Sequence, residues 1–319
     1  MLAGWAADYG HASKPGEKVK RSFYDRERTI ERLATFLGHR DAAKVVKADA
    51  VLWKEDMQTR GNKVPTIRND LSEMSAIWKW GIRSGKLATN SFEGVSPPKP
   101  KAKHRSGRRR AFTNEEAGAI LTAARQQKGY MRWLPWVCCL TGGRLSEVCQ
   151  SYKEDLALVE GVPVLRIHDE GEEDSDDVRS IKNEDSRRNV PIHPALEAEG
   201  FLKYVASLPA GSPLFPDAKP DKMFGLRATN AGRKISRWLK TTVQITDARI
   251  SPNHSWRHWF TGACRSVQMH PEVRSALTGH SAKMDESAQY GDGMKAFVQV
   301  LADALATVPC PVQPRVVES

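Results

Sequence analysis

A basic stretch flanked by prolines divides the chain and sets the strongest limit on how it can fold. Residues 99–110 read KPKAKHRSGRRR and hold seven basic side chains and no acidic one, directly after Pro97 and Pro98. Such a segment cannot bury an apolar face, so it predicts an exposed linker. The 319 residues are therefore expected to fold as two units, residues 1–98 and residues 111–308, with residues 309–319 as a flexible tail.

The excess positive charge is concentrated in the first third of the chain. Residues 1–110 carry 24 Lys and Arg against 12 Asp and Glu, whereas the remaining residues carry 25 against 26. A localised basic excess favours a polyanionic partner, most simply a nucleic acid. The alternative for the first third of the chain is a lysine-rich solvated surface with no nucleic-acid partner. The alternative for the linker is a spacer whose charge only aids solubility.

Several classes of protein are excluded by composition. The chain has no run of about 18 apolar residues and no signal-peptide pattern at its start, so we expect a soluble, cytoplasmic protein without a membrane partner. Its five cysteines are odd in number and lack C-x-x-C spacing, which predicts reduced core residues. No metal site and no cofactor are expected.

Helical periodicity dominates the first unit. Helices are predicted over residues 21–37, 48–60 and 66–84, and a glycine follows each of them at position 38, 61 or 85. Residues 1–20 are weakly patterned and are expected to be loosely held.

The second unit is predicted to be mainly α-helical with a small antiparallel β-sheet. Thr113 and Glu116 form a capping-box pattern before an apolar helix. Short strands are predicted at residues 162–167, 178–182 and 189–192, and the acidic loop at 169–177 is expected to face away from a nucleic acid. Further helices are predicted over residues 131–140, 226–241, 253–267, 271–277 and 294–306.

The second unit contains six residues whose side chains suit phosphodiester chemistry. The segment TGGRLSEV carries Arg144, a hairpin carries Lys182, NHSWRH carries His254 and Arg257, and LTGHS followed by QYG carries His280 and Tyr290. Planar, permanently charged guanidinium groups suit the charged oxygens of a phosphodiester, which gives Arg144 and Arg257 the role of a clamp. A tyrosine of ordinary pKa is protonated at neutral pH, so Tyr290 needs a base, such as His254, or a cationic field before it can attack.

These motifs, with an amino-terminal pattern that ends GKLATN at Asn90, resemble the tyrosine recombinases of the phage integrase family over about residues 30–308. The resemblance implies a helical core-binding domain at residues 1–98 and a catalytic domain at residues 111–308, which close on DNA as a C-shaped clamp. It implies site-specific cleavage and rejoining of duplex DNA through a 3′-phosphotyrosyl link, without metal or ATP. The purpose would be integration or excision of a phage or other mobile element.

The resemblance also assigns individual roles. Tyr290 would be the nucleophile, Lys182 the general acid for the leaving 5′ oxygen, and His280 a second phosphate-binding histidine. Glu147 would be an acidic neighbour that orients the arginines. The basic linker would contact the DNA backbone through Lys101, Lys103, Arg105, Arg108, Arg109 and Arg110.

The implied partner is double-stranded DNA with specific recombination sites. Four protomers would assemble on it, the free chain would be a monomer, and directionality or DNA-bending proteins would assist. The helix at 294–306 would pack onto a neighbouring protomer, although docking onto its own domain would explain the same apolar pattern. The DNA-bound protein would lie at the nucleoid. No arm-binding pattern precedes the core-binding pattern, so the protein is expected to work without one or the chain to begin late.

The sequence differs from the family's usual pattern at two places, and two other functions are compatible with parts of it. Gly143 replaces a residue that is usually larger, and the segment between His280 and Tyr290 is one residue longer than in many members. The helices predicted at 253–267 and 271–277 would also suit a helix-turn-helix regulator, although a regulator has no reason to hold the six residues. A nicking-closing enzyme of the type IB kind would share the chemistry but would neither select sites nor form a synapse.

Overall fold

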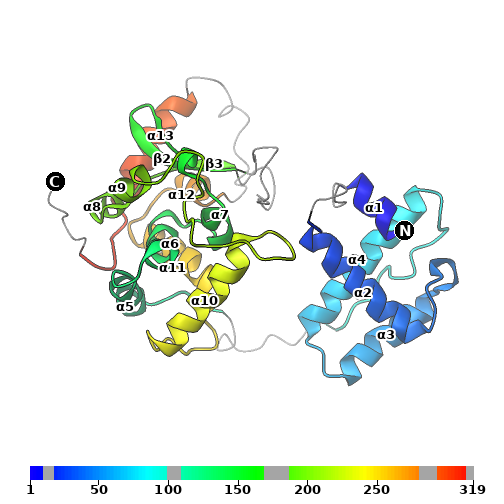
Figure 1. The fold of residues 1–319 in the computed structure, drawn as a ribbon. Coiled ribbons are helices and arrows are strands. Elements are labelled where there is room, and N and C mark those ends of the chain that lie inside the picture. The colour runs from blue at the N-terminus through cyan, green and yellow to red at the C-terminus, as the bar shows by residue number, and fades with distance from the viewer. Residues whose placement is uncertain (10–17, 99–108, 169–186, 280–292, 314–319) are drawn as a thin grey trace. The chain divides into compact units, whose positions relative to one another are not determined.

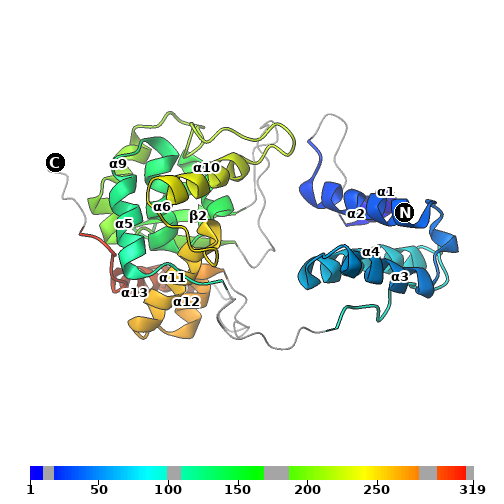
Figure 2. The ribbon, with the colours of Figure 1, turned by 90° about the horizontal axis from the view of Figure 1, so that it is seen from below.

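The computed structural model describes residues 1–9, 18–98, 109–168, 187–279 and 293–313. The chain forms two compact units, Met1–Ser106 and Gly107–Ser319. Figures 1 and 2 show the helices and strands of each unit as ribbons. Each unit has a hydrophobic core of its own. Among the described residues the secondary structure is mostly helical, with one three-stranded antiparallel sheet, so the predicted fold class is confirmed.

The first unit is built on the long helix α4 (Val64–Arg83). The helices α1 (Leu2–Asp8), α2 (Arg21–Leu37) and α3 (Lys47–Thr59) all pack against it. Its buried side chains recur at the helical period, which is why one face can serve three partners. They include Ile67, Leu71, Met74, Ile77 and Trp78.

The first helix was not predicted, and the expectation that residues 1–20 are loosely held is wrong for its beginning. In α1, Trp5 and Ala6 are buried in the core of the first unit. The indole nitrogen of Trp80 donates a hydrogen bond of 2.6 Å to Asp8. These contacts join residues far apart in the sequence, so the local pattern of residues 1–9 could not reveal them.

In the second unit, most other helices surround the apolar helix α6 (Gly129–Thr141), in which nearly every side chain is buried. Helix α6 packs against α5, α7, α8, α10 and α11. The capping box that was predicted from Thr113 and Glu116 is present at the start of α5. The remaining helices are α5 (Asn114–Ala124), α7 (Leu145–Cys149), α8 (Pro194–Ala198), α9 (Phe201–Ala206), α10 (Arg227–Thr241), α11 (Pro252–Ser266), α12 (Pro271–Thr278) and α13 (Gly293–Ala306).

The sheet has the order β1-β2-β3 and consists of β1 (Leu156–Val159), β2 (Val162–Ile167) and β3 (Arg188–Pro191). Strand β1 was not predicted; its register places Leu156 opposite Leu165. Strand β3 runs beside β2 with Arg188 opposite Ile167, so Arg188 begins the strand. The strand predicted at 178–182 and the acidic loop at 169–177 lie outside the described residues.

Helix α13, which is labelled in Figure 1, packs against β2, β3 and α12 of its own unit. Val298, Leu301 and Leu305 are buried in that contact. Packing of this helix onto a neighbouring protomer would therefore compete with its contact within the chain.

The segment after α13 also lies against its own unit, where a flexible tail from residue 309 was predicted. The backbone carbonyl of Val308 lies 2.8 Å from His193 Nε2, and Arg125 donates a hydrogen bond of 2.6 Å to the carbonyl of Gln313. Residues 308–313 are thus held at both ends by side chains that no periodicity in this segment could indicate.

Candidate active site

Arg144 is placed by a turn of two glycines that ends α6. Gly142 has φ +64°, and a Cβ there would collide with the ring of Phe260. A Cβ on Gly143 would lie 2.7 Å from a methyl group of Val148. The second glycine, which departs from the family's usual larger residue, is therefore required by close packing, because a larger residue would push the turn away from α7.

Glu147 binds Arg144 from the first turn of α7. The Arg144 backbone N–H donates to Glu147 Oε2 over 3.0 Å, and the Arg144 guanidinium pairs with Oε1. Arg144 is the N-cap of α7, so the pair closes the helix end. Burial alone would raise the pKa of Glu147, but the charges and hydrogen bonds of Arg188 and Arg144 lower it below its ordinary value.

Arg257 lies on α11 with only 6% of its surface exposed. Its guanidinium donates a hydrogen bond of 3.0 Å to the carbonyl of Gly142 and another to the carbonyl of Thr278. Burial, with the charges of Arg144 and Arg188, lowers its pKa to about 10. A site whose arginines repel one another in this way would be stabilised by an added anion.

His254 is exposed in the first turn of α11, one turn before Arg257. Partial desolvation lowers its pKa below the ordinary value, and so do the nearby charges of Arg109, Arg144 and Arg257. At neutral pH the imidazole is therefore mainly neutral and can accept a proton.

Arg188 also lies in the candidate site, and the sequence did not single it out. Its guanidinium donates a hydrogen bond of 2.8 Å to Glu147 Oε2 and one of 3.0 Å to the carbonyl of Leu277. The sequence shows it only as one of two adjacent arginines before a short strand. No local signal distinguishes it from Arg187, because its burial depends on α7 and α12.

Arg144, Glu147, His254 and Arg257 are brought to one region by α6, α7 and α11. The other candidates, Lys182, His280 and Tyr290, lie outside the described residues. So do four of the linker candidates, Lys101, Lys103, Arg105 and Arg108. Among the described residues no group of three or more His, Cys, Asp or Glu side chains could hold a metal ion.

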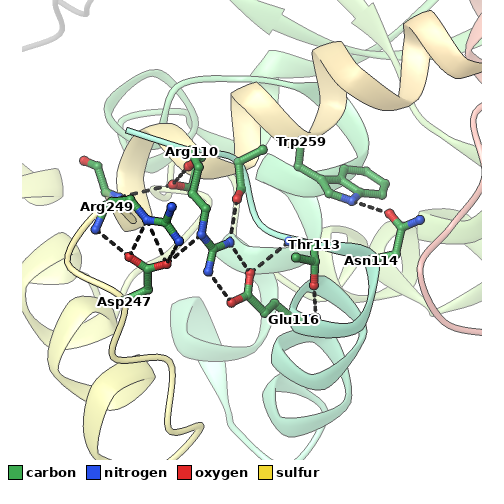
Figure 3. Close-up of polar contacts among 10 residues, drawn as sticks. Arg110, Thr113, Asn114, Glu116, Asp247, Arg249 and Trp259 are labelled. Atoms are coloured by element: carbon green, nitrogen blue, oxygen red, sulfur yellow. Dashed lines mark hydrogen bonds and ion pairs between the residues drawn. The ribbon is translucent and has the colours of Figure 1, made fainter. Parts of the chain in front are cut away.

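Arg110, predicted to contact DNA, belongs to the second unit and binds two carboxylates of the protein (Figure 3). It pairs with Glu116 at 2.7 Å and with Asp247 at 2.8 Å. Its backbone carbonyl accepts a hydrogen bond of 2.9 Å from Ser255 Oγ on α11. Arg110 thus links the start of the second unit to α11, and its contact with DNA stays a prediction.

The Arg110 network predicts a specific loss of stability. Arg110→Met is expected to lower the free energy of unfolding of the second unit by about 1–3 kcal/mol at pH 7, because a hydrogen-bonded ion pair with Glu116 is removed. The hydrogen bonds from Arg110 lower the pKa of Glu116, so this stability exists above the ordinary pKa. The contribution of Glu116 should be lost as the pH falls through this lowered pKa, whereas the pair with Asp247, whose pKa is lowered as well, persists to more acid pH. Chemical denaturation at several pH values measures the difference.

Arg249→Met is the matched control, since Arg249 also binds Asp247 but its side chain is 47% exposed. Exposed pairs contribute little, so this variant should unfold close to wild type. An equal loss in both variants, or a loss in Arg110→Met that does not diminish as the pH falls, would contradict the explanation.

In the part of the chain that the structure describes, no helix is both long enough and apolar enough to cross a bilayer.

The fold of the chain is similar to that of solved integrases. The chain is similar to the Tn1549 transposon integrase, solved in complex with a circular intermediate DNA, with 19% identity and a TM-score of 0.62 over 94% of this chain and 98% of that one. It is similar to a lambda integrase dimer bound to a COC′ core site, with 16% identity and a TM-score of 0.60 over 89% of this chain and 96% of that one. The resemblance that the motifs suggested is thus confirmed at the level of the fold.

Among curated proteins, the chain is 25% identical over 169 residues to the protein IntQ of Escherichia coli (strain K12). The match covers 49% of this chain and 41% of that protein, so the chain spans less than half the length of this relative. No protein-family model matches the chain.

Proposed function

We propose that the chain is a tyrosine-type site-specific DNA recombinase that cleaves and rejoins duplex DNA through a 3′-phosphotyrosyl intermediate. The observation that carries the proposal is that Arg144 and Arg257 lie close enough for their charges to interact. The buried guanidinium of Arg257 holds the Gly142 carbonyl, two residues before Arg144, so one arginine fixes the turn that presents the other. Two guanidinium groups from distant segments suit the two charged non-bridging oxygens of one phosphodiester.

In the proposed reaction, Tyr290 Oη attacks the scissile phosphorus and the bond to the 5′ oxygen breaks. The tyrosine proton passes to His254, which is neutral at the start, and the leaving oxygen receives a proton from Lys182. Attack of a 5′ hydroxyl on the phosphotyrosine reverses these transfers and rejoins a strand. Because the covalent link keeps the energy of the phosphodiester, the reaction needs neither metal nor ATP.

The assembly is proposed by analogy with the structures that share the fold. A lambda integrase tetramer has been solved bound to a Holliday junction; it shares 16% identity, with a TM-score of 0.59, over 89% of this chain and 79% of that one. We propose that four copies of this chain act on two DNA sites, with His280 as a further phosphate ligand and with accessory directionality proteins. Closure of the two units around DNA as a clamp stays a prediction, as does a cytoplasmic, nucleoid-associated location.

The proposal is tested by trapping a covalent complex. The protein is incubated in EDTA with sheared, randomly nicked genomic DNA of its source, denatured in detergent, and passed over a filter that retains protein. We expect retained DNA whose protein-linked strand ends in a 3′ phosphate and whose sequences share one motif. DNA binding without any covalent retention would favour the regulator, and retention without a shared motif would favour a nicking-closing enzyme.

The lowered pKa of His254 predicts how the cleavage rate falls at acidic pH, that is, the acidic limb of the pH–rate profile. If neutral His254 is the base, cleavage at subsaturating DNA should fall on acidification with a midpoint below 6.5, since the free protein's pKa is lowered. His254→Gln should slow the reaction and remove this limb. In His258→Gln the limb should stay and move to higher pH, because the charge of His258 contributes to the lowering. An unchanged limb in His254→Gln would assign the titration to another group.

The basic linker predicts a salt dependence. Replacing Lys101, Lys103, Arg108 and Arg109 by Gln should lower the slope of log K against log salt by about 0.9 for each phosphate that the linker no longer neutralises. Lys203→Gln combined with Lys219→Gln, two exposed lysines of the second unit, should leave the slope unchanged. A fluorescence anisotropy titration between 50 and 200 mM salt, about the range over which such slopes are resolved, makes the comparison. An unaltered slope in the linker variant would reduce the linker to a spacer.

A further inference from the structure

Arg188 occupies a buried position between two parts of the candidate site. It begins β3, opposite Ile167 of β2, and its side chain is 6% exposed. Burial and the charge of Arg144 lower its pKa, whereas Glu147 raises it. A buried guanidinium is costly unless its surroundings bind it, so its placement between α7 and α12 calls for a role.

The guanidinium fills the space between those two helices. One nitrogen binds Glu147 on α7 and another binds the carbonyl of Leu277 on α12, at 2.8 and 3.0 Å. A third nitrogen lies 2.7 Å from where a Cβ on Gly279 would stand. Gly279 has φ +56°, so the chain passes the guanidinium at a place where only glycine fits without strain.

Arg188 and Arg257 together bind the end of α12. Arg188 donates a hydrogen bond to the carbonyl of Leu277, and Arg257 donates one to the next carbonyl, that of Thr278. Carbonyl groups at a helix C-terminus lack partners within the helix and carry partial negative charge, so guanidinium groups suit them. Arg188 thereby ties the end of α12 to Glu147, and Glu147 holds Arg144.

We propose that Arg188 is a positioning residue for strand cleavage. Through Glu147 it fixes the position of Arg144, and through the Leu277 carbonyl it fixes the point at which the chain leaves α12. This inference rests on the proposed function. We assign no phosphate contact to Arg188, because its side chain is buried and is also paired with the carboxylate of Glu147. His280 follows Gly279 directly in the chain, so the end of α12 determines where the next proposed ligand begins.

The test measures the single-turnover rate of covalent adduct formation and, separately, the Kd for DNA, on a nicked duplex carrying the motif shared by the trapped DNA. Arg188→Met is expected to lower the rate about 100-fold with Kd changed less than about threefold, because a misplacement of about 1 Å costs that much. Arg188→Lys keeps the charge but not the planar fork and should recover part of the rate. The matched control is Arg166→Met, an exposed arginine of β2, which should react like wild type.

A double-mutant cycle separates positioning from a merely structural role. If Arg188 acts through Arg144, adding Arg188→Met to Arg144→Ala should cost less than about tenfold further. The inference is overturned if the full loss appears in both backgrounds, or if Arg188→Met and Arg188→Lys both match Arg166→Met. Should Arg188→Met fail to fold, Arg188→Lys decides: a rate equal to wild type overturns the inference and a reduced rate at unchanged Kd supports it.

Hydrogen exchange on the free protein distinguishes failure of this inference from failure of the proposed function. The Arg144 amide donates to Glu147, so it should exchange faster in Arg188→Met than in Arg166→Met. If wild type forms no adduct and this difference is still seen, the proposed function has failed while the positioning of Glu147 by Arg188 stands. If wild type forms the adduct and neither rate nor exchange responds to Arg188→Met, only the inference has failed.

Discussion

Tyr290→Phe is expected to form no covalent adduct with nicked DNA, while its Kd for the same DNA should stay within about threefold of wild type. This is the largest effect that we expect, because in the proposed reaction the phenolic oxygen is the atom that bonds to phosphorus and no other group of the side chain can replace it. The clamp residues and the fold are unchanged by the loss of one oxygen atom. The measurement is gel separation of the protein–DNA adduct after denaturation, beside an anisotropy titration of binding.

Tyr152→Phe provides the control, since it removes the same atom from another tyrosine of the second unit. It should form the adduct at the rate of wild type. An adduct that persists in Tyr290→Phe would place the nucleophile elsewhere and remove the basis of the proposed reaction. If the variant lost DNA binding as well, Tyr290 would be assigned to DNA recognition and not to chemistry.

The helices were predictable because the signals that define them are local. Helix α2 spans the predicted residues 21–37, and Gly38 ends it in the left-handed conformation that glycine adopts easily. Helix α12 likewise begins at Pro271 and ends before Gly279. In each case an apolar stripe and a stop residue lie within one stretch of sequence, so no distant contact had to be known.

The arrangement of the site was only partly predictable. The sequence supplied Arg144, Glu147, His254 and Arg257, and the structure brings them together. It did not supply Arg188, whose partners come from α7 and α12, nor the N-cap geometry that joins Arg144 to Glu147. Residue types suited to a chemistry can be read from a motif, whereas burial and pairing across elements depend on the packing of the whole unit.

Arg110 is a residue for which the sequence suggested one environment and the structure shows another. Its place at the end of a run of basic residues favoured a DNA contact. The structure pairs it with Glu116 and Asp247, of which one lies near in sequence and the other far away. A charge run therefore predicts the average environment of its members but not that of the residue where the folded unit begins.

Arg257 should show the second largest effect on activity, together with a small effect on stability. Arg257→Met is expected to lower the single-turnover rate of adduct formation about 10²- to 10³-fold, as the removal of one preorganised donor at a charged transition state does. Arg257→Lys should recover little, because an ammonium group cannot bind the Gly142 and Thr278 carbonyls and a phosphate oxygen with one planar fork. Arg265→Met, an exposed arginine further along α11, should leave the rate unchanged.

The stability of Arg257→Met is expected to stay close to that of wild type, because two effects oppose each other. The variant loses two hydrogen bonds to backbone carbonyls, but it also removes a buried charge that Arg144 and Arg188 repel and whose pKa is lowered to about 10. A thermal midpoint within about 4 °C of wild type, the shift that roughly 1–2 kcal/mol produces in a unit of this size, would agree with that balance. A large fall in the midpoint with a matching fall in DNA binding would show that Arg257 maintains the fold, and the assignment of its guanidinium to the scissile phosphate would lose its support.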